Sequence, residues 1–464
     1  MKDTLKPDKS YQIEEILEIL EKNNYSSRFK RQQNGIVYTP LNLADFLTKN
    51  ILKFYLVDIL NELLIGKYEK SLSFNELLQI LASLKDKNKR GIWEQTSSLR
   101  ILDPSCGSGS FLITIAENLL KLFKILKPEY SNKDLKELIL KNNIFGVEID
   151  KFAFSISKIR LFEWYVKDLG KKSKMEIKIK NIGKEISKIS KQLNLELNIC
   201  NQDFLLEYNS KEFNIILGNP PYVENKKMRN IDYKKKLKKF NTAYGLYDLS
   251  ILFAEKSLDI LNPRFGYLSF IITNKFLAAD YGKKIRKKLT NESQILEIYD
   301  ISSLSVFRNT AIYPIIISLS KKTHNSNISI KILDSEDDSN ILNLEKMKIV
   351  TIQQDRIKKF PAYVFPITLD MTLINNVCSN YKNLASTFND MIILYRPFGF
   401  IKWADNFVFI EDKKKNDQDL ILLGTANIGK FHIKFEKAIR IANKKLDMAY
   451  FNYNSQFDQI WPKL

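Results

Sequence analysis

Apolar residues recur at helical spacing through the first hundred residues of the chain. Leu43, Phe46 and Leu47 lie three and four positions apart, and similar spacing continues to residue 64. This pattern is typical of amphipathic helices that bury one face. We therefore expect residues 1–98 to form an N-terminal helical region that precedes a sheet.

From residue 99 the pattern changes to short apolar runs separated by helical stretches. Such alternation is typical of an α/β domain with a doubly wound, mostly parallel sheet. The seven expected strands are 99–102, 144–147, 195–200, 213–217, 266–272, 295–299 and 311–319. We predict that this α/β domain spans residues 99–333, with a Lys-rich surface insertion over 166–192.

The alternation is lost beyond a run of acidic residues at 334–338. Residues 340–464 mix short β-prone runs with aromatic clusters, which favours irregular structure. We therefore predict a second, smaller α+β domain over residues 340–464. Its length is small for a self-sufficient recognition domain.

The charge of the chain is strongly positive. Lys and Arg number 73 against 53 Asp and Glu, a formal net charge of +20. A polyanionic partner would explain this surplus, since a cation near a phosphate can release a condensed counterion, but so would a compositional bias of the source genome. The basic residues are concentrated at 223–240, with eight bases and two acids, and at 283–288, where five of six residues are basic.

Composition excludes several classes of protein. Hydrophobic residues make up 44% of the 464 positions, enough to bury sizeable cores, so a largely disordered protein is excluded. No run of about 18 apolar residues and no signal-peptide core is found, which favours a cytoplasmic protein. The 3 cysteines and 2 histidines are too few and too scattered to indicate disulfides, a metal site or histidine-based catalysis.

A glycine turn follows the first expected strand. Residues 103–111 read Asp-Pro-Ser-Cys-Gly-Ser-Gly-Ser-Phe, and a helical pattern comes next. Gly107 and Gly109 let the backbone turn tightly beyond a strand's carboxyl end, where open α/β sheets bind ligands. A simple tight turn explains this segment as well. A P-loop is excluded because no Lys follows the glycines.

Acidic residues follow the second and third expected strands. Glu148 is placed to accept hydrogen bonds from the hydroxyls of a ribose, although an acid that caps the next helix would look the same. Asp203 could accept from an adenine amine, and the ring of Phe204 could stack on the base. These positions favour a nucleoside compound as ligand.

The segment Asn219, Pro220, Pro221, Tyr222 follows the fourth expected strand. The prolines fix the backbone and remove donors, so the carbonyls there can act as acceptors. Asn219 adds a side-chain carbonyl, and Tyr222 adds a flat ring. Together they could hold a planar amino group by two acceptors, whereas a proline turn remains the alternative for the tetrapeptide alone.

Taken in order, DPSCGSGSF, GVEID, QDF and NPPY resemble the motifs of S-adenosylmethionine-dependent, adenine-specific (N6) DNA methyltransferases of the gamma class, a family of restriction-modification systems. GIVYTP at 35–40 is similar to that family's additional upstream cofactor motif. The resemblance covers roughly residues 30–320. It implies a Rossmann-like methyltransferase sheet, S-adenosylmethionine as cofactor, and methyl transfer to the N6 amine of a flipped-out adenine in a specific double-stranded DNA sequence.

The resemblance also implies roles for individual residues. The cofactor-binding residues would be Tyr38, Thr39, Pro40, Asp103, Pro104, Gly107, Gly109, Glu148, Ile149, Asp203 and Phe204. The target adenine would be held by Asn219, Pro220, Pro221 and Tyr222, with Phe307 packing against the base. DNA would be contacted by Lys226, Lys227, Arg229, Lys234, Lys235, Lys236, Lys238 and Lys239. The domain over 340–464 would contribute to target recognition.

Two alternatives remain open. Methyltransferases that act on an amino group in RNA or on a protein glutamine can carry a motif similar to Asn219–Tyr222, and a degenerate subunit could bind DNA for an active partner. The basic segment after Tyr222 and the C-terminal domain favour double-stranded DNA. A separate specificity subunit, an endonuclease subunit or a second copy of the chain is a possible partner, and no membrane or metal partner is expected.

Overall fold

The computed structural model describes residues 39–64, 66, 68–167, 177–178, 181–302, 313–322, 327–332 and 347–366, together with 10–11, 15 and short segments between 410 and 451. Two compact units are distinguished, Met1–Val377 and Cys378–Leu464. No helix among the described residues combines the length and the apolarity needed to cross a membrane.

The centre of the first unit is a nine-stranded sheet with the order β11-β10-β8-β9-β7-β6-β2-β3-β5. Its strands are β2 (Ile101–Asp103), β3 (Ile144–Val147), β5 (Asn198–Cys200), β6 (Ile215–Gly218), β7 (Tyr267–Thr273), β8 (Gln294–Asp300), β9 (Pro314–Ser320), β10 (Asn327–Ile332) and β11 (Lys348–Gln353). The strands β5, β3, β2, β6 and β7 run parallel, whereas β9 is antiparallel to both of its neighbours.

The predicted α/β class is confirmed, and all seven expected strands are present within a few residues of their predicted bounds. The sheet is mixed and larger than predicted, because β10 pairs parallel with β8 and β11 pairs antiparallel with β10. Residues 348–353 therefore extend this sheet, which corrects the predicted domain boundary near 340. β11 forms the edge of the sheet and has four exposed residues, and in β10 beside it only Ile328 and Ile330 are buried, so neither strand has the apolar run that marks a strand buried on both faces.

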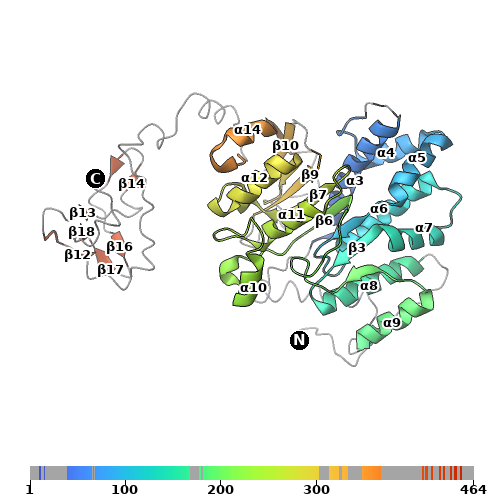
Figure 1. The fold of residues 1–464 in the computed structure, drawn as a ribbon, viewed down its shortest axis with the longest axis horizontal. Helices are drawn as coiled ribbons and strands as arrows, with labels where there is room; N and C mark the ends of the chain where they lie inside the picture. Colours follow the sequence, from blue (N-terminus) through green and yellow to red (C-terminus); the bar gives the residue numbers. More distant parts are fainter. Residues whose placement is uncertain are drawn as a thin grey trace. The chain divides into compact units, whose positions relative to one another are not determined.

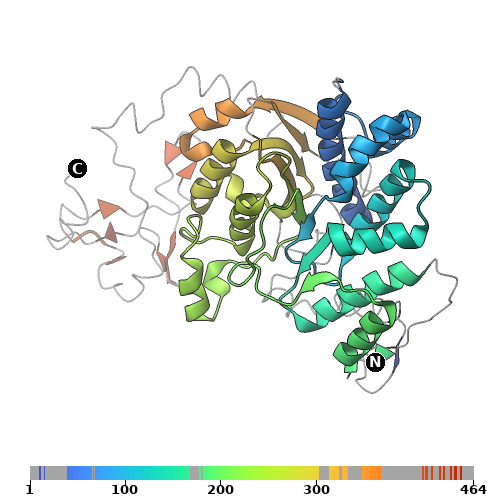
Figure 2. The same ribbon diagram turned by 45° about the vertical axis from the view of Figure 1, so that its right-hand side comes forward.

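Helices cover both faces of the sheet (Figures 1 and 2). The helices that pack on one face are α3 (Leu41–Leu64), α4 (Phe74–Ser83), α5 (Asp86–Ser97), α6 (Ser110–Leu126), α7 (Asn132–Leu138), α8 (Lys151–Val166) and α9 (Ile182–Leu193). Those on the other face are α10 (Ile231–Leu237), α11 (Leu249–Ile260), α12 (Lys283–Glu292) and α14 (Gln354–Lys359). The three helices over 41–97 confirm the helical layer predicted ahead of the sheet.

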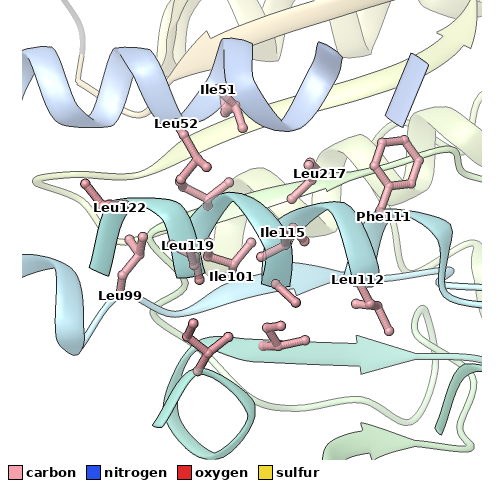
Figure 3. Packing of buried hydrophobic residues seen from close by; sticks show 14 of the residues in the cluster. Ile51, Leu52, Leu99, Ile101, Phe111, Leu112, Ile115, Leu119, Leu122 and Leu217 are labelled. Carbon is pink, nitrogen blue, oxygen red and sulfur yellow. The ribbon is translucent and has the colours of Figure 1, made fainter. Parts of the chain in front are cut away.

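Two apolar cores result from the alternation of side chains along the strands. Ile101 packs with the α3 and α6 side, whereas its neighbour Leu102 packs with the α11 and α12 side. Figure 3 shows the first core, in which Ile51 and Leu52 of α3 lie close to Ile115 of α6. Burying one such side chain contributes about 1.5–3 kcal/mol to folding. These cores fix the ends of the strands where the site residues lie.

The second unit contains short antiparallel strands. The strands β12 (Ile410–Glu411), β18 (Tyr450–Phe451) and β13 (Leu420–Ile421) form one sheet in that order. Two further pairs are β14 (Ile428–Gly429) with β15 (His432–Ile433), and β16 (Ile439–Ile441) with β17 (Lys444–Leu446). In the first unit, β1 (Ser10–Tyr11) pairs with β4 (Ile177–Lys178), which lies within the expected Lys-rich insertion.

Candidate active site

Four of the predicted motifs meet at one edge of the sheet. Asp103 ends β2, Glu148 follows β3, Asp203 comes three residues after β5, and Asn219 follows β6. These four strands are neighbours in the order β6-β2-β3-β5 and run parallel, so their carboxyl ends point the same way. Open α/β sheets bind ligands in this position. The topology thus brings together residues that are up to 116 positions apart in the chain.

The loop after β2 has the backbone conformation that glycine favours. Gly107 and Gly109 have φ angles of +52° and +87°, a region that other residues rarely adopt. A Cβ atom added at Gly109 would approach Ser157 of α8 to 3.1 Å, whereas one added at Gly107 would meet nothing within 4 Å. Gly109 is therefore required for packing, and Gly107 leaves its backbone open to a ligand.

Glu148 holds this loop from the next strand. Its Oε2 accepts from the backbone N–H of Gly107 at 2.7 Å, and its Oε1 accepts from that of Asp150 at 2.8 Å. Burial raises the pKa of Glu148, although the two N–H donors oppose that shift. Each carboxylate oxygen has a further lone pair, so Glu148 can also accept from a ligand hydroxyl.

Asp103 is almost completely buried at the end of β2. Its Oδ1 accepts from the backbone N–H of Ser105 at 3.0 Å. Burial raises the pKa of Asp103 to about 8, and the nearby Glu148 adds to this shift. A Cβ atom at Gly218 would lie 2.7 Å from Oδ1 of Asp103, so the glycine before Asn219 is needed to bring the two strand ends together. Sequence reasoning missed this role of Gly218, and only its position directly before the Asn-Pro-Pro-Tyr segment could have indicated it.

Asp203 and Phe204 belong to a tight turn under α11. Oδ1 of Asp203 accepts from the backbone N–H groups of Leu205 and Leu206 at 2.7 and 3.1 Å. Phe204 is 2% exposed, and its ring stacks on Phe253 with a centroid distance of 5.1 Å. The predicted stacking of Phe204 on a base would require its ring to leave this core, so the burial disfavours that role.

Lys256 of α11 supports the same turn and was missed by sequence reasoning. Its Nζ donates to the carbonyl of Tyr208 at 2.6 Å and to that of Leu205 at 3.3 Å. Burial lowers the pKa of Lys256 to about 8. The amine thereby ties the carbonyls of the turn to α11, and so helps to hold Asp203 in place.

Asn219 lies at the centre of a hydrogen-bond network. Its Nδ2 donates to Oγ1 of Thr39 at 2.9 Å, across 180 positions of the chain. Its Oδ1 accepts from the hydroxyl of Tyr222, which also lies 3.0 Å from the carbonyl oxygen of Ile271 on β7. The hydroxyl of Ser105 lies 3.4 Å from the backbone oxygen of Asn219. The orientation of the amide is thus fixed before any substrate arrives, and the network joins the upstream motif to the Asn-Pro-Pro-Tyr segment.

Tyr222 is only 8% exposed, and burial raises its pKa, so its hydroxyl stays neutral and can donate. The remaining predicted site residues vary in exposure. Pro104 and Pro220 are buried, Pro40 and Pro221 are half-buried, and Ile149 is 67% exposed. Tyr38 and Phe307 lie outside the described residues.

The basic residues after Tyr222 lie on a short 3-10 helix, η3 (Asn225–Lys227), on α10, and in the chain directly before and after α10. Of the eight predicted DNA contacts, seven are exposed and Lys234 is half-buried. Glu224 forms ion pairs with Lys226 at 3.1 Å and with Lys275 at 3.4 Å. Tyr233 of α10 forms a hydrogen bond with Asp203, and burial together with that carboxylate raises the pKa of Tyr233. The basic helix is therefore attached to the cofactor side of the predicted site.

Comparison with known proteins supports the motif assignment. Residues 142–307 match the family described as Eco57I restriction-modification methylase. The chain is 27% identical over 261 residues to the type II restriction enzyme and methyltransferase RM.Eco57I of Escherichia coli, covering 49% of this chain and 25% of that protein. It is 27% identical over 266 residues to the type II methyltransferase M.BstVI of Geobacillus stearothermophilus, covering 56% of this chain and 43% of that protein.

A third relative is the adenine-specific methyltransferase PglX of Streptomyces coelicolor, with 24% identity over 237 residues, covering 44% of this chain and 19% of that protein. The chain thus spans less than half the length of each of these relatives. The resemblance to restriction-modification methyltransferases that the motifs predicted is confirmed over residues 142–307.

Proposed function

We propose that this protein transfers a methyl group from S-adenosylmethionine to the N6 amine of a flipped-out adenine in double-stranded DNA. It would act as the modification component of a restriction-modification system or a related defence system. The observation that carries the proposal is the fixed amide of Asn219, which stands at the same sheet edge as the glycine loop and the buried carboxylates. The names of the relatives, which include an adenine-specific methyltransferase, support the same reaction.

The residues at the sheet edge fit a cationic nucleoside cofactor. Glu148 has lone pairs left for ribose hydroxyls, and the open backbone at Gly107 permits close approach of a ligand. The buried carboxyl groups of Asp103 and Glu148 favour a ligand that is positively charged or rich in donors. S-adenosylmethionine, when bound, supplies an electrophilic methyl group on a sulfonium.

In this proposal the protein activates the amine by accepting its two hydrogens. The lone pair of an adenine amine is delocalised into the ring, so the amine is a poor nucleophile. Oδ1 of Asn219 has a second lone pair and can accept one N–H while Tyr222 still donates to it, and the carbonyl of Pro220 can accept the other. Two acceptors on one side direct the nitrogen lone pair to the opposite side.

No strong base is required, because the amine proton becomes acidic as the new bond forms. Both histidines of the chain, His324 and His432, lie after the motif region, which agrees with this scheme. Positioning and preorganised acceptors would then supply most of the rate acceleration. Removing the adenine from a duplex costs a few kcal/mol, and contact with Tyr222 would offset part of that cost.

Asp103 gives the cofactor affinity a predicted pH dependence. Its raised pKa of about 8 means that it is neutral in the folded protein at lower pH, and its stabilising contribution to the fold is lost as the pH rises through 8. If the carboxylate form binds the cationic cofactor, binding below pH 8 releases a proton. The affinity should therefore rise up to about tenfold per pH unit toward pH 8.

The measurement is calorimetric titration of S-adenosylmethionine between pH 6 and 9, with Asp103→Asn as the control. The cofactor's own amino group titrates in both experiments. The difference between the two proteins in how affinity changes with pH therefore gives the contribution of Asp103. An identical slope in the two proteins would contradict the proposed contact.

The basic segment predicts a salt-dependent interaction with DNA. Substituting Gln for Lys234, Lys235, Lys236, Lys238 and Lys239 should weaken DNA binding. It should also make the logarithm of the DNA-association constant fall less steeply with the logarithm of the salt concentration, by about 0.9 in slope for each phosphate that is no longer neutralised. Cofactor affinity should not change. The matched control substitutes Lys184, Lys188 and Lys191 on α9, which are also exposed, and an unchanged slope in the first variant would contradict the assignment.

The reaction itself is tested by incubating the full chain with S-adenosylmethionine and duplex DNA and sequencing the product for N6-methyladenine. RNA and protein substrates in parallel reactions test the two alternative amino-group acceptors. Methylation of RNA or protein without methylation of DNA would overturn the proposal. Methylation at one sequence by the protein alone would show that no separate specificity subunit is needed.

A further inference from the structure

An exposed apolar turn lies beside the Asn219–Tyr222 segment. Tyr244 and Leu246 are 43% and 63% exposed, and Gly245 between them has a φ of +62°. The turn lies between α10 and α11 in the chain, and a Cβ atom added at Gly245 would lie 3.6 Å from Tyr281, just before α12. A single exposed Leu is ordinary. Two apolar side chains on one glycine turn, in a surface otherwise rich in Lys, call for a specific explanation.

The turn is attached to the chain that leaves the proposed catalytic segment. Nδ2 of Asn225 donates to the carbonyl of Gly245 at 2.7 Å, and the backbone N–H of Asn225 donates to that of Tyr247 at 2.9 Å. The N–H of Leu249 donates to the carbonyl of Val223 at 3.0 Å. These bonds fix the position of the turn relative to Tyr222.

The distance along the chain from Tyr222 to the residue that holds the turn is short enough for one DNA duplex to contact both. Asn225 follows Tyr222 by three residues, which spans about 10 Å in extended chain, less than the ~12 Å width of the major groove. A duplex that delivers one adenine to Tyr222 would therefore also pass the turn.

Two groups of cations lie near the apolar turn. Lys226 and Lys227 are exposed on η3, next to Asn225, whose side chain bonds to the turn. Nζ of Lys284, in α12, lies 5.4 Å from the centroid of the Tyr244 ring, and Lys283 and Lys287 are exposed beside it in the sequence. An apolar tip accompanied by two groups of cations suits a duplex, in which stacked bases lie between two phosphate backbones.

We propose that Leu246, supported by Tyr244, is a wedge that enters the DNA stack and fills the space left by the extruded adenine. This inference rests on the proposed function and adds a DNA-contacting site to it. Extruding a base removes its stacking on both neighbours, and an apolar side chain inserted there restores part of that stacking energy. The fixed turn means that little conformational entropy is lost when the wedge inserts.

The wedge is tested with two duplexes that carry the mapped methylation site. In one the target adenine is paired with thymine, and in the other it faces an abasic position, where extrusion costs less. Leu246→Ala should lower kcat/KM on the paired duplex by roughly 5- to 100-fold, the range that corresponds to the removal of one stacking interaction. It should lower kcat/KM on the abasic duplex by less than about threefold, because the wedge has less extrusion cost to offset there.

The matched control is Ile349→Ala on β11, a residue that is also 63% exposed and lies at the edge of the sheet. It should leave both rates unchanged. If Leu246→Ala lowered kcat/KM equally on the two duplexes, or on neither, the proposal that Leu246 acts as a wedge would be overturned. Absence of methylation by the unsubstituted protein on both duplexes would instead contradict the proposed function, so the two failures are distinguishable.

Discussion

Replacing Asn219 by Ala should lower kcat for methyl transfer by at least about 10²–10³-fold, the usual effect of removing one preorganised polar group at a reacting centre. The substitution removes the side-chain acceptor and with it the hydrogen bonds to Thr39 and Tyr222. The proposed second acceptor, the carbonyl of Pro220, would remain. Cofactor affinity should persist, because most of the residues that would bind it lie at the ends of β2, β3 and β5 rather than beside Asn219. The measurement is single-turnover methyl transfer together with calorimetric titration of the cofactor.

Two further variants separate the roles in this network. Asn219→Asp keeps an acceptor oxygen and should retain more activity than Asn219→Ala. Tyr222→Phe keeps the ring but removes the hydroxyl that donates to Oδ1 of Asn219, so it should cause a smaller loss. Full activity in Asn219→Ala would overturn the mechanism, whereas loss of cofactor binding in that variant would reveal a structural defect.

Replacing Glu148 by Ala should weaken cofactor binding by roughly 10- to 100-fold or more, since a hydrogen bond to a charged group contributes about 1.5–3 kcal/mol. The variant loses the acceptor proposed for the ribose hydroxyls. It also leaves the backbone N–H of Gly107 without its 2.7 Å partner, which loosens the glycine loop. The measurement is the dissociation constant of S-adenosylmethionine, with DNA affinity recorded in parallel and expected to stay unchanged.

The matched control for Glu148→Ala is Asp150→Asn, two positions further on. Asp150 caps α8 by accepting from the N–H of Ala153 at 2.7 Å, and Asn can keep that bond. We expect the control to bind the cofactor almost normally. Equal binding by Glu148→Ala and the unsubstituted protein would show that the carboxylate is not part of the cofactor site.

The strands that are buried on both faces were predictable from the sequence. All seven residues of β7 and of β9 are buried, so each strand reads as a continuous apolar run. The edge strand β11 is mostly exposed, its neighbour β10 buries only two of its six residues, and the chain between them includes the acidic run. The pairing of β10 with β8 and of β11 with β10 depends on contacts that no local pattern records, which is why the predicted domain boundary was misplaced.

Parts of the candidate site were equally predictable, because motif chemistry is local. A glycine that needs a positive φ, as at Gly107, and a carboxylate that ends a strand, as at Asp103, can be recognised within a few residues. The support of these groups comes from distant segments. Lys256 fixes the turn that carries Asp203, and neither residue gives a sequence signal that points to the other.

The sequence by itself determined the α/β class, the order of the motifs and the residue types placed at each strand end, since these depend on local periodicity and turn chemistry. Only the tertiary structure decided which groups touch. The bond between Thr39 and Asn219, the burial of Phe204 against Phe253, and the hydrogen bond of Tyr233 with Asp203 each join segments more than 25 residues apart. Such interactions follow from strand order and core packing, which involve the whole chain at once.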